Sequence, residues 1–446
     1  MKESQFDPQS DAEILREFGL LFSPEANLSQ FAGLEVFLKF LDRGDFRARW
    51  TQSYGGYRAR TMIQFMIGLV VGARSMLEIG EVAKDPLIAR YIGNPVEEAQ
   101  LGRDMRSFTK PMLQELHDTV ISYSVFDFAR VVPQTEILEF DVDATAVIKY
   151  GEQEGVEEGY IEEDKIEACY QYLFIRLHNR NTLFYGTIRA GSTHSQNDFC
   201  GYLSRFLPML KDRWRSVWRA DSGYYNEAAF DLFSSNDATF FIKAPMSPTR
   251  LVLATSSPDI VWSVETDGAS YASRMTMTAA QTKFREVFKR TRLNEKQAKR
   301  AGAVYRYDCV VTNDFGLPDE TAFAAYNVRA NVENTIRELK NDYQLGKIVT
   351  DSFDANDAIT QLTLLTYLLV KHLQAECLPP KLKKTQLNRL RNYVFNVPGR
   401  VLRQARAFLT RIQNLFANEN LYAFILRQLK HIRSWVLSPP VFADAA

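Results

Sequence analysis

The sequence predicts an α/β protein in which a central β-sheet is flanked by helical N- and C-terminal regions. Three observations predict this class. Apolar residues recur at helical spacing up to about residue 130, alternate with polar residues from 137 to 148, and return to helical spacing after about residue 323. We therefore expect a sheet-based core with helices before and after it in the chain.

The N-terminal region, residues 1–132, is expected to be helical. Residues 34–41 and 61–76 both carry apolar side chains at helical spacing. Gly55-Gly56 and Asn94-Pro95 are typical turn sequences, and they separate the predicted helices. Small helical domains serve many purposes, so this pattern alone leaves the task of the region open.

The first predicted strand, residues 137–148, carries carboxylates on one face. Apolar side chains occupy alternate positions and form the other face. The polar face consists of Glu139, Asp141, Asp143 and Thr145. A central strand normally buries both of its faces, so carboxylates on one of them require a specific use.

The core is expected to continue with alternating strands and helices. The predicted strands are 169–177, 182–190, 216–220 and 238–243, and the predicted helices are 195–211 and 226–234. Three strands followed by a helix, a strand and a helix is the order of a ribonuclease-H-like core. Residues 133–243 are therefore interpreted as the first part of such a core.

Residues 244–322 are expected to interrupt the core before its closing helix. They are rich in Val, Thr and Ser and end in a strand-like stretch at 304–311. We interpret them as a β-rich insertion that contains the basic segment 283–300. The remaining predicted segments are the core closing helices, 323–376, and a basic helical C-terminal region, 377–446.

Composition limits the compartment and the partners. The four cysteines are far apart and lack any CxxC spacing, which argues against a zinc site and fits a reducing compartment. The polar N-terminus is unlike a signal peptide, and the longest apolar run, 362–370, is too short to span a bilayer. We expect a cytoplasmic protein with no membrane partner. The formal net charge is zero, but the acidic stretch 152–167 and the basic stretches 283–300 and 381–433 distribute charge unevenly.

Three carboxylates lie in settings that suit chemistry on phosphodiesters. Asp143 lies within a strand, Asp221 follows a strand, and Glu333 lies in a predicted helix. Breaking or joining a phosphodiester requires a deprotonated nucleophile and neutralised charge on the phosphate, and two divalent ions about 4 Å apart supply both. Mg²⁺ prefers carboxylate oxygens, so about three acidic side chains on rigid elements are the set that this chemistry needs.

The helix predicted to start near Tyr326 carries the sharpest pattern. At 100° per residue, Arg329, Glu333 and Lys340 fall within about 40° of one another, and Tyr326 lies about 60° from Arg329. One face would combine a metal-binding carboxylate with two cations that grip phosphates. The alternative is a solvent-exposed helix with an Arg329–Glu333 ion pair.

Five sequence blocks, in order between about Leu138 and Gln374, favour the first interpretation. They are Asp141-Val142-Asp143-Ala144-Thr145, Tyr150-Gly151-Glu152-Gln153-Glu154-Gly155, Arg219-Ala220-Asp221-Ser222-Gly223-Tyr224-Tyr225, Tyr307-Asp308-Cys309-Val310-Val311-Thr312-Asn313 and Val332-Glu333-Asn334-Thr335-Ile336-Arg337-Glu338-Leu339-Lys340-Asn341-Asp342-Tyr343. With them the sequence resembles the bacterial insertion-sequence transposases that have a DDE active site, in the branch with a Tyr-Arg-Glu-Lys signature helix. The second block and the end of the last look most like the subgroup defined by insertion sequence thirteen-eighty.

The resemblance implies a cut-and-paste DNA transposase and assigns its catalytic residues. The family's first Asp lies two residues before a Thr, which selects Asp143 over Asp141. The second heads an Asp-x-Gly-aromatic turn, which selects Asp221, and the Glu is Glu333. These three would be catalytic residues and the ligands of two Mg²⁺ (or Mn²⁺) ions per site. Tyr326, Arg329 and Lys340 match the family positions that bind DNA phosphates.

The implied partners are double-stranded DNA, as terminal inverted repeats and as target, and a second copy of the chain. Relatives cut the ends of the element, pass through a DNA hairpin and join 3′-ends to the target. Two ends cut in concert require a homodimer. When it is bound to DNA, this homodimer would be associated with the nucleoid. The N-terminal region would bind DNA, and Trp262 in the insertion would stack on a base near the break.

Two other functions are weighed against transposition. One is a ribonuclease-H-like DNA nuclease without strand transfer, and the other is a domesticated, non-catalytic DNA-binding protein. The intact acidic triad counts against the second, and the insertion with the Tyr-Arg-Glu-Lys face counts against the first. Where relatives often carry Tyr-Asn-Pro, this chain has Tyr160-Ile161-Glu162 within the acidic stretch.

Four further residues carry weaker signals. Asp141 either supports the metal site or pairs with a basic side chain. His194 is expected to cap a helix rather than to act in catalysis, and Trp214 and Trp218 are expected to be buried packing residues. The basic residues of the C-terminal region are expected to contact phosphates: Lys381, Lys383, Lys384, Arg389, Arg391, Arg400, Arg403, Arg406 and Arg411.

Overall fold

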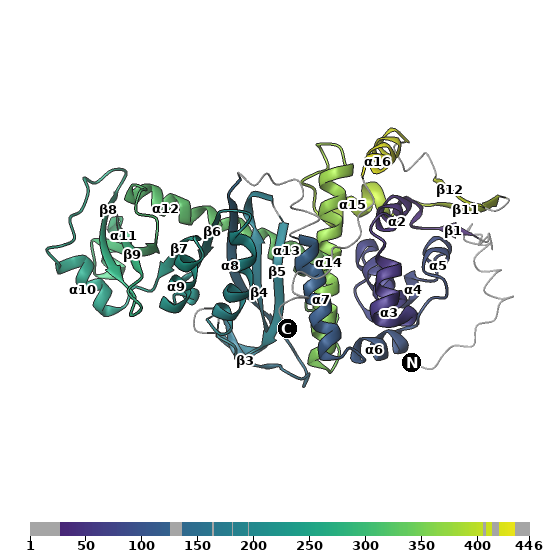
Figure 1. Ribbon diagram of the computed structural model, residues 1–446, viewed down its shortest axis with the longest axis horizontal. Helices are drawn as coiled ribbons and strands as arrows, with labels where there is room; N and C mark the ends of the chain where they lie inside the picture. The colour runs from purple at the N-terminus through teal and green to yellow at the C-terminus, as the bar shows by residue number, and fades with distance from the viewer. Residues whose placement is uncertain are drawn as a thin grey trace.

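The computed structural model describes residues 27–124, 136–162, 165–180, 182–194, 196–404, 407–412 and 419–432. Figure 1 shows helices from the N-terminal region at one end, a large sheet in the middle and the insertion at the other end. Ser195, where a helix is predicted to begin, and Arg406 lie outside the described residues, as do 1–26, 125–135 and 433–446.

One sheet of nine strands runs through the described part of the protein. Its order is β3-β4-β2-β6-β7-β10-β9-β8, and β5 also pairs with β4. The strands are β2 (Leu138–Ile148), β3 (Glu157–Glu162), β4 (Lys165–Leu177), β5 (Thr182–Ala190), β6 (Ser216–Ala220), β7 (Thr239–Ala244), β8 (Ala269–Met277), β9 (Lys283–Arg292) and β10 (Tyr305–Thr312).

The middle of this sheet has the strand and helix order predicted for the core. β2 pairs antiparallel with β4 and parallel with β6, and β6 pairs parallel with β7. Helices α8 (Phe199–Lys211) and α9 (Glu227–Ser235) follow β5 and β6 and bury Phe206, Phe230 and Phe233 in the core with the sheet. The predicted α/β class with a ribonuclease-H-like core is therefore confirmed.

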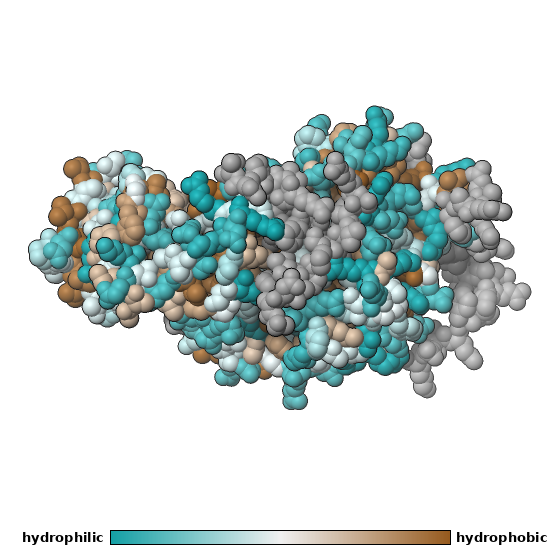
Figure 2. All heavy atoms as spheres, viewed as in Figure 1, coloured by the Kyte–Doolittle hydropathy of each residue, from teal (hydrophilic) through white to brown (hydrophobic). Residues whose placement is uncertain are grey.

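The insertion extends the core sheet rather than forming a second one. β10 pairs antiparallel with β7, and β9 and β8 follow outward. The insertion also holds two short helices, α10 (Pro248–Ser256) and α11 (Glu295–Ala301). Hydrophobic atoms gather on its outer end in Figure 2. The exposed large apolar side chains of the insertion are Leu251, Val252, Val261, Val264, Met275, Met277, Val304 and Phe315.

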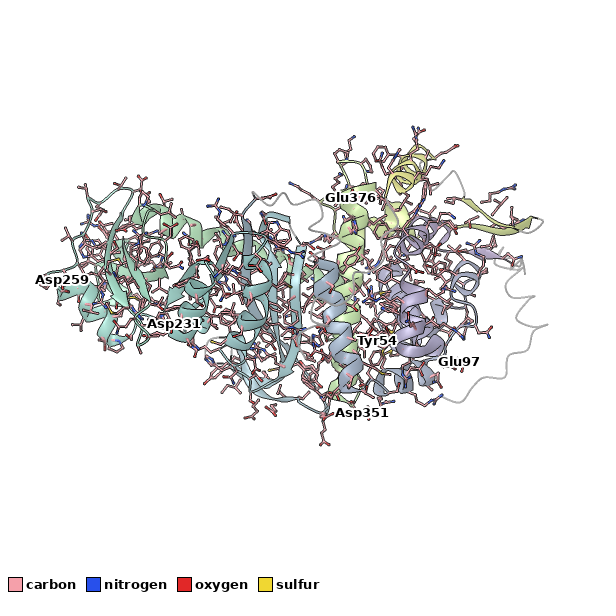
Figure 3. The ribbon with its side chains drawn as sticks, in the orientation of Figure 1. Tyr54, Glu97, Asp231, Asp259, Asp351 and Glu376 are labelled. Atoms are coloured by element: carbon pink, nitrogen blue, oxygen red, sulfur yellow. The ribbon has the colours of Figure 1, made fainter. Side chains whose placement is uncertain are left out.

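The N-terminal helices share one hydrophobic core with α14 (Phe353–Cys377). Figure 3 marks the two ends of α14 with Asp351 and Glu376. α14 buries the whole apolar run 362–370, and Gly55, with φ 81°, interrupts α3 at the predicted turn. The helices before the sheet are α2 (Glu35–Asp42), α3 (Phe46–Val71), α4 (Met76–Val82), α5 (Pro86–Ile92), α6 (Glu98–Arg106) and α7 (Lys110–Ser122). Within the described residues no single helix has the length and apolar character to cross a membrane, although α3 and α4, which meet at a bend of 93°, pass that test as a pair.

The expectation of a purely helical C-terminal region is wrong. β11 (Gly399–Gln404) and β12 (Ala407–Ile412) pair with each other, and β11 also pairs with β1 (Leu28–Ser29). The partner strand β1 comes from the other end of the chain, and local periodicity does not reveal such a non-local pairing. The region also contains α15 (Leu387–Leu390), a π-helical turn (Arg391–Phe395) and α16 (Glu419–His431).

The signature segment is not one continuous helix, which corrects the predicted single face. α12 (Asp319–Asn327) ends after Tyr326, a 3-10 turn (Val328–Asn331) follows, and α13 (Val332–Asp342) begins beside Glu333. The two helices pack into different cores. Described side chains of α12, Ala322 and Phe323, pack with the insertion side of the sheet, whereas those of α13, Ile336 and Leu339, pack into the N-terminal core. The 3-10 turn thus separates a helix that packs in one core from a helix that packs in the other.

Candidate active site

Asp143 and Asp221 lie side by side because of the strand register. Parallel strands β2 and β6 pair Val142 with Ala220. The next residue along the chain is Asp143 in the first case and Asp221, directly after β6, in the second. The carboxyl ends of neighbouring parallel strands are a common place for active sites. Asp221 Oδ1 accepts a hydrogen bond of 2.9 Å from the backbone N–H of Gly223, which fixes the turn after β6 and leaves Oδ2 for other contacts.

Arg329 joins the two aspartates. Its Nη2 lies 2.8 Å from Asp143 Oδ1 and 3.4 Å from Asp221 Oδ2, and its Nε donates to the carbonyl of Val142 at 3.2 Å. Burial lowers the pKa of Arg329, but the two carboxylates outweigh burial, so this pKa lies above its ordinary value. The predicted phosphate-binding arginine thus contacts the candidate metal ligands themselves.

The site concentrates negative charge around Asp143. Burial, and to a smaller extent the carboxylates of Asp221 and Glu333, raise the pKa of Asp143 to about 6 against the opposing effects of Arg329 and the Ala144 N–H. One guanidinium therefore does not compensate the acidic groups here. An additional positive charge near Asp143 would favour its ionised form.

Glu333 and Lys340 reach the site from α13. Glu333 is exposed in the first turn of the helix, and it lines a hollow of about 400 Å³ together with Asp143, Thr145 and Lys340. Lys340 Nζ donates to Thr145 Oγ1 at 2.7 Å and to the carbonyl of Ala146 at 2.9 Å. Burial lowers the pKa of Lys340. The two side chains thus stand over the polar face of β2.

α13 is held in place by a buried ion pair. Lys371 Nζ of α14 lies 3.0 Å from both carboxylate oxygens of Glu338, and both side chains are almost fully buried. Breaking such a pair leaves a buried charge without a partner. The Glu338–Lys371 contact therefore fixes the helix that presents Glu333.

A second hollow, of about 730 Å³, continues from Asp221 and Lys340 over β3. Its walls include Glu158, Tyr160 and His194. The acidic stretch thus forms a strand that borders the candidate site, which the sequence pattern does not predict. His194 Nδ1 accepts from the backbone N–H of Gln196 at 3.2 Å and stabilises the turn before α8, whereas Asp198 rather than His194 is the N-cap residue of that helix.

Other predicted residues have structural roles. Asp141 is fully buried between Arg219, at 2.7 Å, His178, at 2.8 Å, and Arg176, at 3.4 Å. Its role as a partner of basic side chains is therefore the one that the structure supports. Trp214 and Trp218 are buried, as expected.

Two DNA-contact candidates have contacts of a different kind. Trp262 is half-buried, with the guanidinium of Arg290 over its ring at 4.7 Å and the Tyr307 ring at 5.9 Å. Arg391 is buried, and it donates to the carbonyls of Val70 and Leu69 at the end of α3. Arg391 is therefore a structural residue, in contrast to its predicted contact with phosphates.

The family described as "Transposase DDE domain group 1" matches residues 46–434 of the chain. The chain belongs to this family of DDE transposases. A DDE transposase is an enzyme that cleaves DNA and transfers DNA strands, and members of the family generally use divalent metal ions. No curated protein matches the sequence.

Two solved transposase structures are remotely similar to this transposase. The first is the "Cryo-EM structure of piggyBac transposase synaptic complex with hairpin DNA", with 10% identity over 82% of each chain and a TM-score of 0.40. The second is the "Crystal structure of a pre-cleavage Mos1 transpososome", with 9% identity, 35% of this chain, 53% of that chain and a TM-score of 0.16. Neither likeness is close enough for a comparison of residues.

The donor set fits a hard divalent cation in its chemistry. Asp143, Asp221 and Glu333 offer carboxylate oxygens, which Mg²⁺ and Mn²⁺ prefer. Among the described residues, however, no three acidic, His or Cys side chains are grouped closely enough to hold a metal ion as they stand. At this site Arg329 lies between two of the carboxylates, and Glu333 extends into solvent.

Proposed function

We propose that this DDE transposase cuts the ends of a DNA element and joins its 3′-ends to target DNA, with Asp143, Asp221 and Glu333 as the catalytic residues. The observation that carries the proposal is the adjacency of Asp143, within β2, and Asp221, directly after the parallel strand β6, where both contact Arg329. Glu333 lines the same hollow as Asp143. Acidic side chains that border open hollows are suited to an extended substrate such as a DNA backbone.

The three carboxylates would hold two Mg²⁺ or Mn²⁺ ions, which lower the pKa of the attacking water or 3′-hydroxyl and neutralise charge on the phosphate. The chain's own residues position the DNA. Lys340 already points a hydrogen-bonded ammonium group into both hollows. Arg329 and the half-buried Tyr326 beside it would lie near a phosphate that is bound to the ions held by the carboxylates.

The branch of the family, the hairpin step and the bacterial host are proposed from the resemblance of the sequence to insertion-sequence transposases. The Tyr326, Arg329, Glu333 and Lys340 spacing supports membership of the Tyr-Arg-Glu-Lys branch, with insertion sequence thirteen-eighty as the most similar subgroup. This branch supports a hairpin step and a bacterial host, in which the enzyme would act on nucleoid DNA. We propose a homodimer on DNA, because two element ends are cut together.

The DNA contacts would extend beyond the catalytic site. We propose that the N-terminal helices bind the terminal inverted repeats. Exposed cations of the C-terminal region also suit phosphate contacts, because they form no part of the buried core. These cations are Lys381, Lys384, Arg389, Arg400 and Arg411.

The test is incubation of the protein with Mg²⁺ and labelled DNA that carries the element's two ends. A transposase produces double-strand breaks, hairpin-ended fragments and product joined to target DNA. Breaks without joined product would replace this proposal with a nuclease. DNA binding without any cleavage would instead indicate a domesticated DNA-binding protein.

A further inference from the structure

We propose that Arg329 is the built-in counter-ion of the metal-free active site, and that a divalent cation displaces it from between Asp143 and Asp221. This inference rests on the proposed function, because it takes the two aspartates to be metal ligands. It adds a competition between a side chain and the metal that the catalytic assignment does not contain.

The contacts of Arg329 place its charge where a bridging cation would lie. A single atom, Nη2, contacts oxygens of both aspartates, at 2.8 and 3.4 Å. Its Nε donates to the carbonyl of Val142, the residue before Asp143 in β2. A guanidinium and a divalent cation repel each other at such distances, so the two compete for the position between the aspartates.

Arg219 of β6 lies beside the same face of β2 and is a permanent counter-ion with which Arg329 can be compared. Arg219 bridges Glu139 and Asp141, each at 2.7 Å, and only 3% of its side chain is exposed. Asp141 is 0% exposed. Asp221, in contrast, is 39% exposed and Arg329 17%. Water and ions therefore reach Arg329 and Asp221, whereas Arg219 and Asp141 are closed to solvent and only Glu139, at 34%, is exposed in that bridge.

The backbone around Arg329 permits the displacement. Arg329 belongs to the 3-10 turn Val328–Asn331, which links α12 and α13. The two helices are anchored in separate cores, and both Asn327 and Val328 are exposed. Movement of the Arg329 side chain therefore breaks two ion pairs and the hydrogen bonds to the Val142 carbonyl and Tyr326, and it does not involve the apolar side chains of either core.

The displaced guanidinium would remain beside the reaction centre. A phosphate bound to the divalent ions that the carboxylates would hold offers it a bidentate partner in place of the aspartates. Metal binding and DNA binding would then favour each other, because each removes a competitor of the other, and this coupling acts equally in both directions. Arg329 would thus change partners from carboxylate to phosphate as the site is loaded.

The experiment is a titration of the full-length protein with Mn²⁺ in the absence of DNA, with free Mn²⁺ measured by electron paramagnetic resonance. Arg329→Ala and Arg329→Gln should each bind Mn²⁺ about tenfold more tightly than the wild type, because one nearby positive charge is lost. The matched control is Arg337→Ala. Arg337 lines the hollow that Asp143 and Glu333 border, but its Nη2 donates to Asn334 rather than to an aspartate. This control should stay within about twofold of the wild type.

The results separate this inference from the proposed function. Unchanged or weaker Mn²⁺ binding by both Arg329 variants, with intact wild-type binding, would overturn the inference and leave the catalytic assignment standing. Equal tightening by Arg337→Ala would also overturn it, because general electrostatics would then explain the effect. Wild-type Mn²⁺ binding that survives Asp143→Asn would contradict the proposed ligand set and with it the inference. Arg329→Gln retains a hydrogen-bond donor, so it provides the test if Arg329→Ala does not fold.

Discussion

Arg219 Nε lies 2.7 Å from Oδ1 of Asp141, a carboxylate that no solvent reaches. His178 and Arg176 contact the other oxygen, Oδ2. Asp141 and Asp143 lie on the same face of β2 two positions apart, yet only Asp143 borders an open hollow. The structure therefore divides the acidic face of β2 into a sealed structural part and an accessible part.

Asp141→Asn is expected to destabilise the protein far more than Asp143→Asn. Removing the Asp141 charge leaves buried Arg219 without full compensation, and breaking a buried ion pair costs about 3–5 kcal/mol. Urea denaturation of both metal-free variants measures the difference in the free energy of unfolding. Equal destabilisation, or a larger effect of Asp143→Asn, would contradict the division of the strand.

The stability of the metal-free protein is expected to depend on pH through Asp143. Its pKa is raised from 3.8 to about 6, chiefly by burial. The folded state therefore binds this proton more tightly than the unfolded state, so the stabilisation is present below about pH 4 and is lost as the pH rises through about 6. The loss amounts to about 3 kcal/mol.

Asp143→Asn is the variant that measures this contribution. The free energy of unfolding of the variant, relative to the wild type, should rise by that amount between pH 4 and pH 7, because the variant cannot ionise. Chemical denaturation at several pH values in a chelating buffer checks it. A difference that stays constant across this range would show that burial does not perturb Asp143.

Much of the candidate site follows from local sequence pattern. Alternating apolar residues predict β2, and the short apolar stretch before Asp221 predicts β6. Once these strands are parallel neighbours, the register that pairs Val142 with Ala220 brings Asp143 and Asp221 together. Local pattern is sufficient here because each strand carries its own burial signal.

The remaining features depend on contacts that are remote in sequence. The spacing from Tyr326 to Lys340 fits one helix, but a 3-10 turn at Val328–Asn331 separates two helices that pack in different cores. A basic residue such as Arg391 is expected on the surface. It is instead buried because the carbonyls at the end of α3 need donors. Neither result can be obtained from the periodicity of one segment.

Lys340→Met is expected to impair DNA cleavage with little effect on folding. The substitution removes a partly buried ammonium group that reaches Thr145 and both hollows. Loss of such a preorganised charge typically lowers the rate by about 10²-fold. The slope of log affinity for DNA against log salt concentration should also fall by about one. Wild-type cleavage rates and an unchanged salt slope would remove Lys340 from the site.

Trp262→Ala tests whether the tryptophan packs or stacks on DNA. Because Arg290 covers its ring and Tyr307 contacts it, we expect a loss of about 1–2 kcal/mol in the free energy of unfolding. Affinity for an end with an unpaired base should then change little. Wild-type stability together with weakened binding of such an end would restore the stacking role.

The central claim is that Glu333 completes a catalytic triad with Asp143 and Asp221. Glu333→Gln keeps the shape and the hydrogen-bonding capacity of the side chain but removes its charge. The most direct measurement is cleavage of labelled element ends with Mg²⁺ by this variant, alongside its affinity for the same DNA. We expect the rate of cleavage to fall by on the order of 10³-fold while the affinity for the ends stays near the wild-type value. Cleavage at the wild-type rate would contradict the catalytic role of Glu333.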